Sequence, residues 1–325
     1  MHVPRKASTA ATVMLAAILL SSCSQSEPSS GAAAKETQAD RSEWPEELPS
    51  SGLVKGLELP LEGYMVSYAD QVVIDSALRT LQTECMAEYG FTVDLPRPGV
   101  NPPASSNSMN IERRYGITDR AQAEKYGYLL PPEQQKYTAE QTPDLPDIQV
   151  EVLTGRTKPE PLAPPTGSDG AYSGSGDKTK PARAEYDGKK LHEDGCVGWA
   201  KRKLKLNESD AGFVVQLAST GVSESRPHQP VEKAITKWSA CMKGKGHAAS
   251  DPYRAMEQGL GGTDTDDSIA LALDDIDCKE QTRLIEVWFK EESAVQKQLI
   301  KKNKDQLTAV ERRMKEVLTA AKAVK

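Results

Sequence analysis

Five cysteines constrain the fold of this 325-residue chain more than any other feature of its sequence. They are Cys23, Cys85, Cys196, Cys241 and Cys278. Because five is an odd number, at least one cysteine must have a role outside an intramolecular disulfide. If Cys23 is that cysteine, the other four can form two disulfides in any of three pairings. The first question is therefore what the region around Cys23 does.

The first 23 residues contain the parts of a secretory signal peptide in the usual order. Positive charges at Arg5 and Lys6 precede an apolar run from Ala10 to Leu20. This run has 11 residues, whereas a bilayer-spanning helix needs roughly 20. We therefore expect a cleaved signal rather than a permanent membrane span. An exported chain matures in a compartment where disulfides form and persist.

The signal ends in Leu20-Ser21-Ser22-Cys23, which resembles the lipobox of bacterial lipoproteins. The resemblance implies cleavage after Ser22 and a thioether-linked diacylglycerol on Cys23. Stable anchoring takes two acyl chains, such as palmitate, and diacylglycerol supplies two. The alternative is an ordinary secretory signal that leaves Cys23 as a spare thiol. The even number of remaining cysteines favours the lipid.

The predicted organisation follows from changes in composition along the chain. A Ser-, Ala- and Glu-rich segment after Cys23 has no hydrophobic period and is typical of a flexible tether. The region that follows alternates helical patterns with a stretch rich in Pro and Gly. We predict a signal peptide at 1–22, a tether at 23–43, a first helical unit at 44–205 with an irregular insertion at 92–190, and a second helical unit at 206–325.

Helical periodicity and stop signals predict the main helices. Residues 67–89 and 231–245 are amphipathic, and a glycine follows each. Shorter helices are expected after Cys196 and at 213–218. A long helical region is expected from Thr263 nearly to Lys325.

Three short elements are predicted inside the insertion. Residues 119–126 form a short helix capped by Thr118, and residues 148–153 alternate like a strand. The Asp187-Gly188 pair predicts the turn of a small hairpin.

An internal repeat selects among the disulfide pairings. Cys85-Met86 and Cys241-Met242 each end a predicted helix, and each is followed by three residues and a glycine. Downstream of each copy stands one further cysteine, which we place at the start of another helix. This symmetry favours Cys85 with Cys196, and Cys241 with Cys278, over the other two pairings. On the chain-entropy model the loops of 111 and 37 residues contribute roughly 5 and 4 kcal/mol, as upper estimates.

Several longer segments resemble a group of uncharacterised lipoproteins of actinobacteria. The segments are ECMAEYGF from Glu84, RRYGITDRAQAEKYGYLLP from Arg113, GCVGWA from Gly195, WSACMKGKGH from Trp238 and LALDDIDC from Leu271. The group has no established activity. The resemblance therefore implies location and architecture, not a reaction.

Charge narrows the classes of partner. The formal charge is −6, and removal of Arg5 and Lys6 makes it −8, which does not favour nucleic acid. Residues 279–325 alone carry twelve Lys or Arg and seven Asp or Glu, a net charge of +5. Such a tail can face an anionic partner, such as phospholipid or an acidic wall polymer. The simpler interpretation, which we favour, is a solvated helix with i,i+4 pairs such as Glu286/Lys290 and Glu311/Lys315.

No familiar catalytic or nucleotide-binding motif is present, and we predict no catalytic residue, metal or cofactor. His192 beside Cys196 is expected to lie in a solvated turn rather than to bind metal. Acidic residues at 264–267 lack the glycine of a calcium loop and are better explained as the start of a helix. An extracytoplasmic enzyme acting on envelope material remains the alternative function, with these candidate residues in the insertion: Tyr115, Asp119, Tyr126 and Tyr128.

Two further patterns predict packing rather than ligand binding. Trp199 and Trp238 each lie three residues from a cysteine, and we expect both rings to pack in the core beside the disulfides. The C-terminal segment has a heptad seam, which is expected to pack on the chain's own helices rather than on a partner. Its members are Leu307, Val310, Met314, Val317, Ala321 and Val324.

Together these patterns predict a mainly α-helical protein. Two helix-pair units, each closed by a disulfide, are expected to surround one core, with the irregular insertion between them and a long helical region at the C-terminal end. The expected function is that of a lipid-anchored extracytoplasmic protein that binds an envelope partner, such as a membrane protein, a peptide or a wall polymer, without catalysis.

Overall fold

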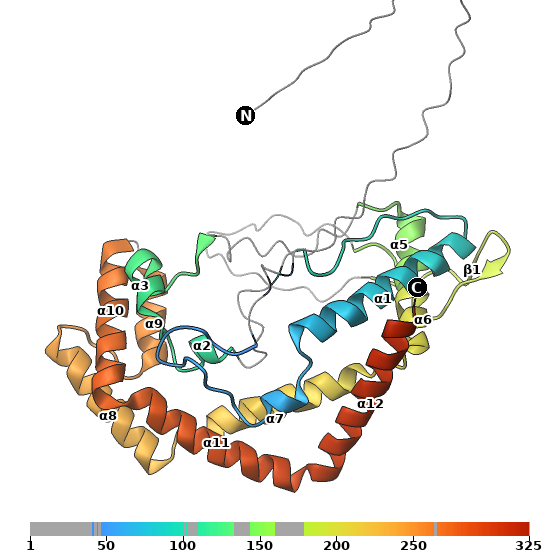
Figure 1. Cartoon of the computed structure of the whole chain (residues 1–325). Helices are drawn as coiled ribbons and strands as arrows, with labels where there is room; N and C mark the ends of the chain where they lie inside the picture. The colour runs from blue at the N-terminus through green and yellow to red at the C-terminus, as the bar shows by residue number, and fades with distance from the viewer. Residues whose placement is uncertain are drawn as a thin grey trace, which may run out of the picture. The chain divides into compact units, whose positions relative to one another are not determined.

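The computed structural model describes residues 41, 44, 47–100, 102, 110–132, 144–159, 179–262 and 265–324. Within these ranges the chain is mainly helical, with eleven α-helices and one two-stranded hairpin (Figure 1). This confirms the predicted fold class. No helix in the described ranges is long and apolar enough to cross a membrane. Cys23, the predicted signal peptide and most of the predicted tether lie outside the described residues.

The elements follow one another along the chain with short connections in its second half. They are η2 (Glu62–Tyr64), α1 (Tyr68–Glu88), α2 (Ile111–Arg114), α3 (Arg120–Tyr126), α5 (Asp147–Thr154), β1 (Glu185–Tyr186), β2 (Lys189–Lys190), α6 (Gly195–Lys203), α7 (Glu208–Ser225), α8 (Gln229–Gly244), α9 (Pro252–Gly261), α10 (Thr265–Thr282), α11 (Leu284–Lys302) and α12 (Lys304–Ala323).

The two Cys-Met-x-x-x-Gly segments end α1 and α8 with the same backbone geometry. After α1 the N–H of Phe91 donates to the carbonyl of Met86 at 3.1 Å, and after α8 the N–H of His247 donates to the carbonyl of Met242 at 2.9 Å. The glycine before each donor has a positive φ, +83° and +95° respectively. This is the six-residue bond of a Schellman C-cap. The sequence repeat is therefore also a structural repeat.

Helices α1, α5 and α6 form the first disulfide-linked unit. Cys85 of α1 joins Cys196 of α6, with a Cα–Cα distance of 5.6 Å. Where α5 ends and α6 begins, Gly155 and Gly195 lie back to back with φ of +71° and +60°. A Cβ on Gly195 would lie 2.4 Å from the backbone nitrogen of Gly155. The two helix ends can therefore meet this closely only because both residues are glycine.

The predicted hairpin lies just before α6. Strand β1 pairs antiparallel with β2, and Tyr186 faces Lys189 across the pair. Asp187 and Gly188 form the turn with φ of +47° and +70°. Two successive positive φ values are the signature of a type I′ turn, which suits a two-residue hairpin loop.

Helices α8, α9 and α10 form the second disulfide-linked unit. Cys241 of α8 joins Cys278 of α10, with a Cα–Cα distance of 5.7 Å. Both α9 and α8 pack on α10, and α11 packs on α8 and on α7. The predicted disulfide pairing is thus confirmed in both units.

Helix α12 carries the predicted heptad seam and packs it against the chain's own helices. Leu307 and Val310 belong to the largest buried cluster, which also contains side chains from α7, α8, α10 and α11. Val317 and Ala321 pack with side chains of α1 and α6. The predicted internal packing of the seam is confirmed. A third cluster surrounds the Cys85–Cys196 disulfide, so the buried apolar residues of the described ranges form three clusters rather than one core.

Two predictions inside the insertion are wrong in detail. Residues 148–153 are helical within α5, not a strand. In an eight-residue segment an alternating pattern also leaves apolar residues on one helical face, and packing against α6 selects the helix. The cap of α3 is Asp119, whose carboxylate accepts from the N–H of Gln122 at 3.1 Å. The hydroxyl of Thr118 instead donates to the carbonyl of Glu112.

The C-terminal half also differs from the prediction. Helix α7 extends well beyond the expected 213–218, and α9 was not expected at all. The long helical region is three helices, because the backbone is interrupted at Arg283, which has a φ of +55°, and at Asn303. Cys278 lies near the end of α10 rather than at the start of a helix.

We predict that loss of the first disulfide costs much of the stability of the fold. Cys85→Ser with Cys196→Ser is expected to lower the free energy of unfolding by about 2–5 kcal/mol, measured by urea denaturation of the mature chain. Cys23→Ser is the matched control and is expected to change it by less than about 0.5 kcal/mol. Peptide mapping without reduction should join Cys85 to Cys196, and a peptide joining Cys85 to Cys241 would contradict the pairing.

Candidate functional site

The candidate catalytic residues of the insertion do not converge on one cleft. The side chains of Tyr115 and Tyr128 are buried, and each hydroxyl donates to a different carboxylate. Asp119 is occupied as the N-cap of α3 and accepts a hydrogen bond from Ser51. Tyr126 is half-buried in the last turn of α3. The two buried tyrosines instead lead to two polar networks, which sequence reasoning missed.

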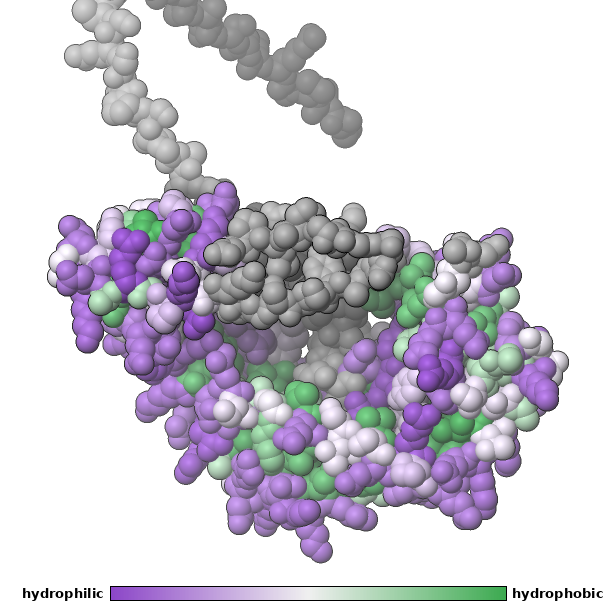
Figure 2. Space-filling model, turned by 180° about the vertical axis from the view of Figure 1, so that it is seen from behind, coloured by the Kyte–Doolittle hydropathy of each residue, from purple (hydrophilic) through white to green (hydrophobic). Residues whose placement is uncertain are grey.

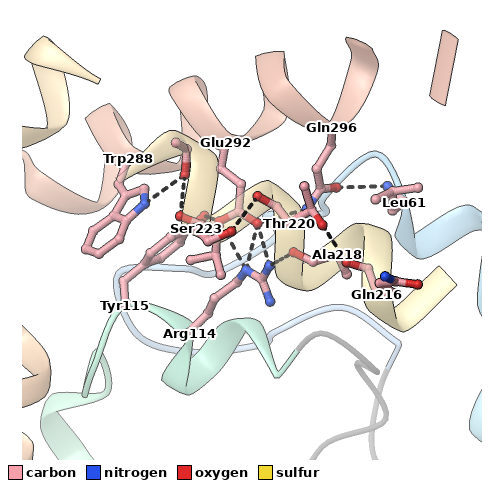
Figure 3. Close-up of polar contacts among 12 residues, drawn as sticks. Leu61, Arg114, Tyr115, Gln216, Ala218, Thr220, Ser223, Trp288, Glu292 and Gln296 are labelled. Atoms are coloured by element: carbon pink, nitrogen blue, oxygen red, sulfur yellow. Dashed lines mark hydrogen bonds and ion pairs between the residues drawn. The ribbon is translucent and has the colours of Figure 1, made fainter. Parts of the chain in front are cut away.

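The first network is centred on the buried carboxylate of Glu292 in α11 (Figure 3). The guanidinium of Arg114 approaches it, with Nη2 2.6 Å from Oε1 and Nε 2.8 Å from the same oxygen. The hydroxyl of Tyr115 donates to Oε2 at 2.9 Å. Arg114 also donates to the carbonyl of Ala218 in α7 at 2.7 Å. One carboxylate thus ties the α2 segment to both α11 and α7.

Gln296 extends this network toward the N-terminal segment. Its Nε2 donates to Glu292 at 2.8 Å, and its Oε1 accepts the backbone N–H of Leu61 at 3.0 Å. A Cβ on Gly221 of α7 would lie 2.9 Å from the Gln296 side chain. The glycine therefore leaves the space that the buried amide occupies.

The second network is centred on Asp275 and Lys279 in α10, whose side chains are both 0% exposed. Lys279 Nζ lies 2.9 Å from Asp275 Oδ2 and 2.7 Å from the carbonyl oxygen of Ile117. The hydroxyl of Tyr128 donates to Asp275 at 3.0 Å, and the indole N–H of Trp238 donates at 2.9 Å. The segment from Ile117 to Tyr128 is held on α10 and α8 by these bonds.

The pKa shifts and the burial of the groups in both networks favour a structural role over a role in proton transfer. Burial raises the pKa of Tyr115 well above its ordinary value, and the neighbouring carboxylate of Glu292 adds to the effect. Burial likewise raises the pKa of Tyr128 and of Asp275, and it lowers the pKa of Lys279. A general base needs a pKa near the working pH and contact with substrate. These groups are buried and hydrogen-bonded to one another, so we interpret both networks as packing elements.

The three histidines among the described residues lie in separate contacts. His192 stacks on Trp199, with ring centroids 5.9 Å apart. His228 Nδ1 is 3.0 Å from a carboxylate oxygen of Glu291, and His247 Nε2 is 2.9 Å from one of Asp274. In the described part of the chain no group of three or more His, Cys, Asp or Glu side chains could hold a metal ion. Asp266 and Asp267 lie in the first turn of α10, and Asp264 is outside the described residues.

The two tryptophans differ in burial. Trp238 is 0% exposed and packs in the same cluster as Cys278, so its predicted place in the core is confirmed. Trp199 is half-buried and lies between the two clusters on either side of α6. Lys203 Nζ is 5.1 Å from the centroid of the Trp199 ring.

The exposed side of α12 carries an open groove of about 680 Å³. Its charges are mixed, because it contains Arg312 and Lys315 as well as Glu311 and Glu316. The expected Glu311/Lys315 ion pair is absent among the described contacts, and Glu286 pairs with Arg283 instead of Lys290. The groove is lined by Lys205, Thr308, Glu311, Arg312, Lys315, Glu316, Thr319, Ala320 and Ala323.

Removal of the Lys279 cation should show how much the buried charge of Asp275 lowers the free energy of unfolding when it has no counterion. Lys279→Met is expected to destabilise the chain by about 3–5 kcal/mol at pH 7, because it leaves an uncompensated buried charge. In this variant the pKa of Asp275 is raised by burial above the value of the unfolded chain, about 3.9. The folded state then binds a proton that the unfolded state has released, so stability falls as the pH rises above about 4.

Urea denaturation between pH 4 and pH 7 measures this effect. The difference in the free energy of unfolding between Lys279→Met and the parent chain should be smallest at pH 4 and grow toward pH 7. Lys237→Met on the exposed side of α8 is the matched control and should cost less than about 0.5 kcal/mol at either pH. A loss of stability that does not depend on pH would contradict the interpretation that Lys279 compensates the buried charge of Asp275.

Comparisons with protein-family models, with curated proteins and with solved structures find no match to this chain. Its function must therefore be argued from its own residues.

Proposed function

We propose that this chain is a lipid-anchored extracytoplasmic protein that binds a partner in the cell envelope and does not catalyse a reaction. The lipid is attached to Cys23, and the tether at 23–43 separates the helical part from the membrane. The partner is a membrane protein, a peptide or an anionic component of the envelope.

The observation that carries this proposal is that four of the five cysteines form two disulfides with one another. All four cysteines after the predicted lipobox are joined in disulfides, Cys85 with Cys196 and Cys241 with Cys278. Disulfides of this kind belong to an oxidising compartment outside the cytosol. The pairing also leaves Cys23 as the one cysteine without a disulfide partner. This fits its place at the end of a signal peptide.

The hydrogen bonds of the buried ionisable groups support a function without catalysis. Glu292, Asp275 and Lys279 are enclosed by hydrogen bonds from the chain itself. The alternative enzyme would rely on Tyr115, Asp119, Tyr126 or Tyr128. Asp119 is occupied as the N-cap of α3, and the hydroxyls of Tyr115 and Tyr128 are buried and already donate to carboxylates. A substrate would have to break these bonds before reaching either group. Binding through an exposed surface requires no such rearrangement.

Substitution of the lipidated cysteine tests the anchoring. In the native host, Cys23→Ala is expected to leave the protein without acyl chains and to release it from the membrane fraction into the medium. Ser24→Ala is the control and should remain in the membrane fraction. Fractionation with immunoblotting, together with labelling by a fatty-acid analogue, measures both effects. Retention of Cys23→Ala in membranes washed at about 0.5 M salt, which screens electrostatic contacts between the protein surface and the bilayer, would falsify the lipid anchor.

A further inference from the structure

A stripe of lysines runs along α11 and ends where α11 meets α12. Lys290, Lys297 and Lys301 are separated by seven and four residues, so they lie on one line of the helix surface. Lys302 and Lys304 follow on either side of the junction at Asn303. All five side chains are exposed. We call these five residues the lysine stripe.

The charges of the lysine stripe are not balanced by the acidic residues near them. Glu286 pairs with Arg283, Glu291 pairs with His228, and Glu292 is buried against Arg114. The exposed Asp305 beside Lys304 offsets only one of the five charges. Within the described residues none of the five lysines has a carboxylate oxygen within 4.0 Å. The expected pairing within the helix therefore does not account for the stripe. Figure 2 shows hydrophilic side chains along the lower edge of the molecule, where α11 and its junction with α12 lie in Figure 1.

Helix electrostatics explain only part of the stripe. Lys301 and Lys302 lie in the last turn of α11, where a cation is favoured by the macrodipole, but this effect does not extend beyond one turn. Lys290 and Lys297 are too far from that end to benefit. Lys304 is the first residue of α12, where a cation is disfavoured by the macrodipole. Three of the five positions thus have no explanation within the helices.

The positive charge stands out because the chain as a whole is acidic, with a formal charge of −6. Lysine ammonium groups are strongly hydrated point charges on flexible stems. They suit diffuse attraction to a surface of phosphate groups better than the bidentate recognition of one ligand. Near an anionic bilayer each lysine increases partitioning about fivefold. The groove on α12 is a weaker candidate because its acidic and basic side chains nearly cancel.

We propose that the lysine stripe binds the anionic phospholipid surface of the membrane to which the chain is tethered. The biological setting rests on the proposed lipid anchor, but the contact itself does not require the acyl chains. Bound in this way, α11 would lie along the headgroups and orient the helical part of the protein relative to the membrane.

Vesicle binding of the unacylated mature chain tests the proposal. The protein begins at residue 23 and carries Cys23→Ala, so that any association reports the protein surface and not the lipid. The vesicles contain 40% phosphatidylglycerol in phosphatidylcholine, or phosphatidylcholine alone, and binding is measured by co-sedimentation at low salt. We expect binding to the anionic vesicles only, with loss at about 0.5 M salt because of screening.

The variant reverses all five charges of the lysine stripe to glutamate. A reduction in partitioning of at least about 100-fold is expected from five lysines. The control reverses five exposed lysines that lie outside α11 and α12 and have no ion pair in the described contacts, so its net charge is identical. The control residues are Lys55, Lys125, Lys233, Lys237 and Lys243. Circular dichroism verifies that both variants keep the helical content of the parent.

Three results would overturn the proposal. The first is an equal loss in the control, which would show that net charge alone matters. The second is equal binding to vesicles of phosphatidylcholine. The third is no binding to anionic vesicles together with binding to soluble polyphosphate, which would assign the stripe to a soluble polymer. Because the test protein has no lipid, none of these results depends on whether Cys23 is acylated in the cell.

Discussion

Two buried carboxylates on successive helices hold the irregular part of this chain in place. Glu292 on α11 binds Arg114 and Tyr115, and Asp275 on α10 binds Tyr128. The segment from Ile111 to Tyr128 contains only two short helices, and it buries four large side chains, those of Ile111, Tyr115, Ile117 and Tyr128. A buried carboxylate is costly unless its hydrogen bonds are satisfied, and the segment supplies part of them, beside Gln296 for Glu292 and Lys279 and Trp238 for Asp275. Docking of the segment and burial of the two carboxylates are thus coupled.

The parts of the fold that could be predicted from sequence are those with local causes. Helix α1 was predicted to within a residue because its N-cap Ser67 and its glycine stop act on neighbouring backbone groups. The repeat predicted the disulfide pairing for a similar reason, since both copies use the same helix end. The Asp251-Pro252 pair before α9 is also a local start signal, so the start of α9 is predictable from sequence. The break at Arg283 has no such signal, because arginine is not a residue that favours a positive φ.

The buried networks could not be predicted because their members are far apart in the chain. Arg114 and Glu292 are 178 residues apart, and Tyr128 and Asp275 are 147 apart. Local patterns singled out Tyr115 and Tyr128 as candidate residues of the alternative enzyme. They did not indicate which acids these residues would meet. Asp275 and Lys279 are spaced by four residues, a pattern typical of an exposed helix pair. The packing of α8, α9 and the 117–128 segment on α10 removes them from solvent.

Helix α11 carries the Glu292 network on one face and part of the lysine stripe on the other. Its inner face holds Glu292 and Gln296, which are fixed by hydrogen bonds from the α2 segment and from Leu61. Its outer face holds Lys290, Lys297 and Lys301, which have no such partners among the described residues. Because the inner contacts fix the rotation of the helix about its axis, they also fix the direction in which the lysines point. A membrane contact through these lysines would therefore orient α11, and with it every helix that packs on the same core, rather than hold a loosely attached tail.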